Sequence, residues 1–86
     1  MSFATTHAWQ RAAQRLPFHP DEWDFEGVVL DIIARISGAP SQSWLLSRRA
    51  SGIEIWATRM RGHAVVVAYA PMDACVITVM PSERKK

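Results

Sequence analysis

The second half of the chain contains four runs rich in β-branched and aromatic residues, separated by very short connections. The runs read SWLLSRR, GIEIWATRM, HAVVVAYA and ACVITVM, and the connections are built from ASG, RG and PMD. A crossover between parallel strands needs about a dozen residues or more, whereas connections this short join antiparallel neighbours. Glycine, proline, serine and aspartate also favour turns. The sequence therefore predicts a four-stranded antiparallel meander that begins near Ser43.

The first half carries apolar residues at helical spacing instead. We expect a first helix over about 7–16, capped by Thr5 or Thr6. We expect a second helix with Pro20 in its first turn and a stop at Gly38. The apolar residues of this second helix recur every three or four positions, namely Phe25, Val28, Val29, Ile32, Ile33 and Ile36.

Gly27 interrupts that helical pattern and costs about 1 kcal/mol relative to alanine inside a helix. Either the glycine permits close packing, or the helix begins nearer Val28. Both readings keep the fold class unchanged. We expect an α+β fold of one domain over residues 1–86, in which an N-terminal helical hairpin packs on one face of the sheet. The expected core includes Trp9, Val28, Ile32, Ile36, Val65, Val67, Ile77 and Val79.

The strand runs differ in how they alternate. In the second run, Ile53, Ile55 and Ala57 alternate with Glu54, Trp56 and Thr58, as in a strand with one covered face. The third and fourth runs are more uniformly apolar and are expected to lie centrally. A chain of this size buries a modest core, so we expect an exposed apolar patch and a homodimer or another protein partner. The residues expected to form the patch are Trp23, Trp44, Trp56 and Met60.

Composition limits the classes of protein. Cys75 is the single cysteine, so an internal disulfide is impossible, and the three histidines are far apart, so no zinc pattern is present. The N-terminus lacks the pattern of a signal peptide. The longest apolar run, 64–72, is far shorter than the ~20 residues that span a bilayer. We therefore expect a cytoplasmic protein without a membrane span, metal or cofactor.

Charge is distributed unevenly along the chain, although the net charge is only +2. Residues 21–31 carry five acids and no base, whereas residues 32–86 carry eight arginines and lysines against three acids. The first helix adds a stripe of His7, Arg11 and Arg15, spaced four residues apart and therefore on one face. Such polarity suggests that one side of the domain meets an anion, with the acidic segment away from it.

Arginine and histidine together suit chemistry at a phosphodiester. Arginine pairs with phosphate oxygens and stabilises the charge of the transition state. Histidine can accept a proton from a ribose 2′-hydroxyl or donate one to the leaving oxygen. Each side chain also has a simpler interpretation as part of a solvated surface, and Arg48 and Arg49 are expected to point to opposite faces of a strand. The candidates are His7, Arg11, Arg15, Ser47, Arg48, Arg49, Arg59, Arg61, His63 and Thr78.

Two stretches resemble the small RelE-like toxin superfamily, most closely its BrnT-type branch. The first is Thr6-His7-Ala8 followed by Arg11 and Arg15, and the second is the strand VITVMP over 76–81. The likeness covers nearly the whole chain in the order of elements and about fifteen residues in detail. It implies a RelE-like fold, metal-independent RNA cleavage and neutralisation by a cognate antitoxin. His7 and Arg11 match the helix motif, and Thr78 matches the last strand.

Two functions of different classes follow. One is a toxin-type endoribonuclease, encoded beside an antitoxin or in a phage or mobile element. Its expected catalytic residues are His7, Arg11, His63 and Thr78, and its expected RNA-binding residues are Arg15, Arg48, Arg49, Arg59 and Arg61. The alternative is a non-catalytic RelE-like module that binds a cognate or host protein, with arginines in salt bridges. Convergence of His7, Arg11 and another basic residue in one concave site would favour the enzyme.

Overall fold

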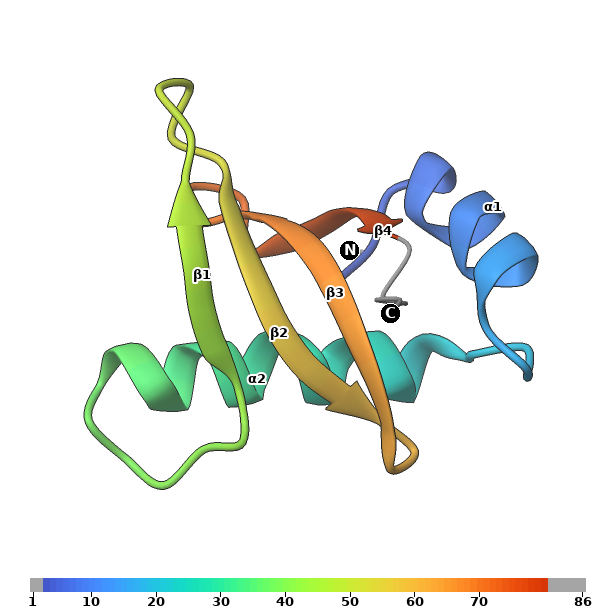
Figure 1. Ribbon diagram of the computed structural model, residues 1–86, viewed down its shortest axis with the longest axis horizontal. Coiled ribbons are helices and arrows are strands. Elements are labelled where there is room, and N and C mark those ends of the chain that lie inside the picture. The colour runs from blue at the N-terminus through green and yellow to red at the C-terminus, as the bar shows by residue number, and fades with distance from the viewer. Residues whose placement is uncertain (1–2, 81–86) are drawn as a thin grey trace, which may run out of the picture.

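The computed structural model describes residues 3–80, and Figure 1 shows their arrangement. The elements follow the order α1 (Thr6–Arg15), α2 (Glu22–Ile36), β1 (Trp44–Arg48), β2 (Glu54–Met60), β3 (His63–Ala70) and β4 (Cys75–Met80). The strands lie in the order β1-β2-β3-β4, and each neighbouring pair is antiparallel. The predicted α+β class and the four-stranded antiparallel meander are therefore confirmed.

Local signals set the ends of both helices. Thr5 caps α1, because its hydroxyl accepts a hydrogen bond from a first-turn amide at 3.1 Å. Asp21 caps α2 in a reciprocal capping box with Asp24. Pro20 was predicted to lie in the first turn, where proline is favoured, but it precedes the cap residue. Gly38 follows the helix with a φ of +83°, a backbone conformation that glycine adopts readily.

Gly27 belongs to α2, since the helix begins at Glu22. No atom lies within 4 Å of the position that a Cβ would occupy on this residue. Close packing among the described residues therefore does not explain the glycine.

The face of β2 that packs against the helices is the opposite of the one predicted from residue type. Trp56 and Met60 are each 2% exposed, and Glu54 and Thr58 are buried on the same face. Ile55 faces away from the helices, so the prediction that its face is the covered one was wrong. Tryptophan and methionine bury more apolar surface than isoleucine and alanine, and the polar residues between them have hydrogen-bond partners. Trp56 and Met60 do not contribute to an exposed patch.

The core lies between α2, α1 and this face of the sheet. Trp9 packs edge-on against Phe25 with ring centroids 4.7 Å apart, which joins the two helices. Trp9 and Ile77 are half-buried. Ile36 is 60% exposed, against the prediction, because the last turn of α2 extends past β1 (Figure 1). The predicted core residues that are fully buried are Val28, Ile32, Val65, Val67 and Val79.

The two edges of the sheet differ in their cover. β4 was expected centrally but forms an edge, and a short parallel bridge with the N-terminal segment covers it. The Val76 amide donates to the Phe3 carbonyl at 2.9 Å, and the Thr5 amide donates to the Val76 carbonyl at 3.0 Å. β1 forms the other edge, and no backbone segment among residues 3–80 pairs along its outer side. Trp44 and Leu46 on this strand are 62% and 53% exposed.

Candidate functional site

The basic stripe of α1 is held by contacts within the chain. Arg11 donates from Nε to the His7 Nε2 at 3.4 Å and from Nη1 to the Gln14 side-chain oxygen at 2.9 Å. Arg15 donates from Nη1 to the Val79 carbonyl at 2.7 Å. Arg15 therefore satisfies a backbone oxygen at the edge of β4 and fixes α1 along that strand. This structural role was not expected for a residue predicted to bind RNA.

Arg48 and Arg49 lie on opposite faces of the sheet, as the alternation of a strand predicts. The Arg48 Nε lies 3.0 Å from the Glu54 carboxylate on the helix side. Arg49 lines a groove of about 310 Å³ on the helix-free side, together with Thr78 of β4. Only one of the two arginines is therefore available to a given site.

The turn between β2 and β3 gathers three more predicted residues. Arg59 donates to the Gly62 carbonyl at 3.0 Å. The Arg61 guanidinium lies 4.9 Å from the centre of the Phe18 ring and binds two acids of the α2 N-terminus. The His63 ring lies 5.2 Å from the same phenyl ring. Arg61 and His63 therefore both contact Phe18, whereas Arg59 is held by the turn itself.

The acidic segment contacts one of the bases expected to meet an anion, although the charge pattern suggested that it lies away from the anion-binding side. The Arg61 Nη2 lies 2.8 Å from the Asp24 carboxylate and 3.5 Å from that of Asp21. Partial burial acts to raise the pKa of Asp24, but the hydrogen bond from Arg61 and that from the Asp21 backbone amide outweigh it. The pKa of Asp24 lies below its usual value as a result, and the carboxylate neutralises a cation predicted to bind RNA.

The predicted catalytic residues do not line one common groove. Thr78 lines the helix-free groove with Arg49, Ile53, Ala68, Ile77 and Met80. His7, Arg11 and His63 do not line that groove, nor the groove that lies between β1, β2 and the end of α2. Thr78 follows Ile77, whose carbonyl accepts from the Thr5 hydroxyl at 3.0 Å, so α1 runs beside Thr78. His63 begins β3 and lies beside the Phe18 ring, whereas Thr78 pairs with Ala68 near the other end of that strand.

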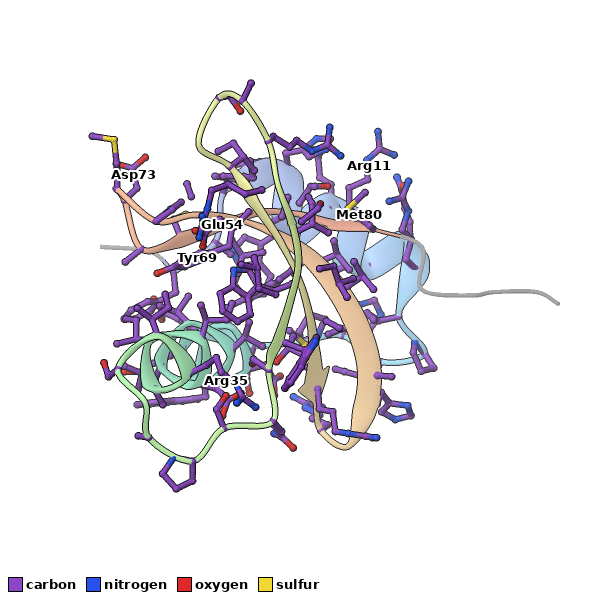
Figure 2. All side chains as sticks on the ribbon, turned by 60° about the vertical axis from the view of Figure 1, so that its left-hand side comes forward. Arg11, Arg35, Glu54, Tyr69, Asp73 and Met80 are labelled. Atoms are coloured by element: carbon purple, nitrogen blue, oxygen red, sulfur yellow. The ribbon has the colours of Figure 1, made fainter. Side chains whose placement is uncertain are left out.

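A second groove, of about 380 Å³, lies between β1, β2 and the end of α2. Its only carboxylate, Glu54, is buried and accepts from the Arg48 Nε at 3.0 Å and the Trp56 Nε1 at 3.1 Å. Figure 2 shows that Arg35 on α2 lies well apart from Arg11 on α1. It also shows Glu54 beside Tyr69, its partner on β3. Burial raises the pKa of the Tyr69 hydroxyl, and the negative charge of Glu54 raises it further. The groove is lined by Arg35, Ile36, Trp44, Leu45, Arg48, Glu54 and Trp56.

Arginine and tryptophan form the rim of this second groove. The Arg35 guanidinium lies 4.8 Å from the centre of the Trp44 ring, an arrangement in which the cation is attracted to the ring face. Arg35 also donates to the carbonyls of Ser43 at 2.9 Å and Ser41 at 3.0 Å, which fixes its position. The sequence interpretation included Trp44 in an apolar patch but did not place Arg35 beside it.

A buried polar network was also missed. Asp31 of α2 accepts hydrogen bonds from the Ser41 and Ser43 hydroxyls, and Ser43 also bonds the Thr58 hydroxyl at 2.8 Å. Ser43 and Thr58 are almost completely buried. The network ties α2 and the loop before β1 to β2, so its role is structural. Within residues 3–80, no group of three or more His, Cys, Asp or Glu side chains is arranged to hold a metal ion.

Comparison of the chain with protein-family models, curated proteins and solved structures found no match. No described helix combines the length and the apolar character needed to cross a membrane.

Proposed function

We propose that this chain is a non-catalytic module that binds a cognate or host protein through β1 and the groove beside it. The observation that carries the proposal is the open edge of β1, where Trp44 and Leu46 are exposed next to the groove. An open strand edge offers backbone hydrogen bonds to an added strand. Tryptophan and arginine are also the residues that most often dominate binding energy at protein interfaces.

The charges of the groove define the chemistry of the partner segment. Arg48 and Glu54 pair with each other in this groove, whereas Arg35 donates to two backbone carbonyls and has no ion pair among the described residues. An extended segment with an apolar side chain for the groove and an acidic side chain for Arg35 fits these features. The partner is therefore expected to supply an acidic and apolar strand.

Affinity capture from cells that encode this chain tests the proposal. A partner held by the wild type should be lost, by at least about tenfold, when Leu46→Lys or Trp44→Ala removes an exposed anchor, since such anchors contribute 1.4 kcal/mol or more. Met72→Lys is the matched control, because Met72 is 97% exposed and lies outside the groove. Recovery of the same partner by all variants would contradict the proposed surface.

RNA cleavage is a second candidate, favoured by the place of α1 beside Thr78. His7 and Arg11 are hydrogen-bonded neighbours on that helix, and Arg49 and Thr78 line the helix-free groove. In the free protein the Nε2 of His7 accepts a hydrogen bond from Arg11, so this nitrogen would have to exchange that partner for a ribose hydroxyl. His63 lies beside Phe18 and does not complete such a site.

A further inference from the structure

A pocket of about 250 Å³ lies between α2 and the end of β2, separate from the groove beside β1 and from the helix-free groove. Figure 1 shows the end of β2 against α2. Trp23, Gly27 and Asp31 line the helix wall of this pocket at intervals of four residues. Residues four apart are neighbours on a helix surface. The wall therefore presents, in order along one stripe, an aromatic ring, a position without a side chain and a carboxylate.

The middle of this stripe is open because Gly27 has no side chain. No atom lies within 4 Å of the position that its Cβ would occupy, although glycine is less favourable than alanine inside a helix. Trp23, one turn earlier, is 77% exposed, and no described ring or cation stacks on its indole. Glycine permits another group to approach the backbone closely. Gly27 thus keeps a space open beside an exposed ring.

The arginines near the pocket do not offer it a free positive charge. The Arg61 Nη2 lies 2.8 Å from the Asp24 carboxylate, so these two charges neutralise each other. Arg59 also lines the pocket, but its guanidinium donates to the Gly62 carbonyl within the turn. Strand alternation places the Arg59 side chain on the face of β2 opposite to Met60.

Asp31 is the acid of the stripe whose charge has no cation partner within residues 3–80. Its Oδ2 accepts hydrogen bonds from two serine hydroxyls, whereas its Oδ1 accepts only a long one, from the Gln42 amide at 3.4 Å. A carboxylate oxygen has two lone pairs, so Oδ1 can accept a further bond from a charged N–H donor.

From this arrangement we infer that the pocket binds a cation on an aliphatic stem, as in the side chain of arginine. The stem lies across Gly27 against the Trp23 ring, and the guanidinium donates to the Asp31 Oδ1. The two ends of the stripe are eight residues, or about 12 Å, apart along the helix. A compact cation is too small to contact both ends, whereas a long basic side chain packs its stem on apolar surface and extends its charged head.

This inference goes beyond the proposed function, because no residue of this pocket lines the groove beside β1. The contacts are partly open to solvent, where stacking on tryptophan and one charged hydrogen bond each contribute modestly. We therefore expect a dissociation constant on the order of 1 mM at low salt, which rises as salt screens the Asp31 charge.

Nuclear magnetic resonance titration of the full chain tests the inference with a capped tripeptide that carries arginine between two glycines. The peptide should shift the Gly27 amide and Trp23 indole resonances to saturation. The same peptide with citrulline, which keeps the shape of arginine without its charge, should bind at least about tenfold more weakly. Butylguanidinium distinguishes two sources of the cation: equal affinity indicates a free small ligand, and weaker binding than the arginine peptide indicates a side chain of a partner.

Gly27→Leu tests the open position, because leucine fills the space beside Trp23 while it favours the helix more than glycine does. This variant should unfold at no lower temperature than the wild type, yet bind the arginine peptide at least about tenfold more weakly. Trp23→Ala should weaken binding by about threefold. Leu30→Ala, at an exposed residue of α2 outside the pocket, should bind like the wild type. Asp31 stays unchanged because its hydrogen bonds stabilise the fold.

Circular dichroism establishes that each variant is folded. An arginine peptide that causes no saturable shift, a citrulline peptide that binds equally well, or a folded Gly27→Leu variant with wild-type affinity would overturn the inference. The Trp23→Ala variant decides the matter in the same way if Gly27→Leu does not fold. None of these outcomes affects the proposed partner surface, since Trp44 and Leu46 lie outside the pocket and are unchanged in these proteins.

Discussion

Replacing Trp56 with alanine is expected to lower the free energy of unfolding by about 3–5 kcal/mol, the usual cost of removing a buried tryptophan. The Trp56 side chain is 2% exposed and belongs to the core between β2 and the helices. Its Nε1 also donates to the buried Glu54 carboxylate. A domain of this length is typically stable by about 4–13 kcal/mol, so the loss is a large share of the total.

Urea denaturation followed by circular dichroism measures this effect, with Trp44→Ala as the matched control. Trp44 is mostly exposed, so its replacement should cost less than about 1 kcal/mol. A larger loss for Trp44→Ala than for Trp56→Ala would mean that β2 turns its other face to the helices.

Replacing Asp31 with alanine should cost about 2–3 kcal/mol, because hydrogen bonds to a charged group are stronger than those between neutral groups. The Asp31 carboxylate accepts from the hydroxyls of Ser41 and Ser43, and its Oδ1 accepts from the Gln42 amide at 3.4 Å. Ser43 is fully buried and cannot replace the lost partner with water. The remaining hydrogen bond between Ser43 and Thr58 limits the loss of stability.

The same denaturation experiment checks this second effect. Asp73→Ala is the control, because Asp73 is an exposed acid in the turn before β4 and its replacement should change stability by less than about 0.5 kcal/mol. Equal stability of the two variants would show that the Asp31 network contributes nothing to folding.

The strands and helices were predictable because their signals are local. Turn residues, the Thr5 cap and the spacing of the α2 core residues each depend on neighbours within a few positions. The covered face of β2 was not predictable from residue type alone. Glu54 and Thr58 look like surface residues, and only the partners Arg48, Trp56 and Ser43, some of them distant in the sequence, explain why they are buried.

The candidate site was less predictable, because the position of a long arginine side chain depends on hydrogen-bond partners that lie far away in the sequence. Arg15 binds a carbonyl 64 positions away, and Arg61 binds Asp24, 37 positions away. Neither partner can be recognised from local pattern. In contrast, the opposite placement of Arg48 and Arg49 depends only on strand alternation and was predicted.

Incubation of the purified protein with RNA and a chelator distinguishes a binding module from a ribonuclease. We expect no cleavage above that in buffer alone, and therefore no difference between the wild type and His7→Ala. Cleavage by the wild type that falls by about 10²–10⁴ in a folded His7→Ala variant, with Arg11→Lys also impaired, would show that the chain is an enzyme.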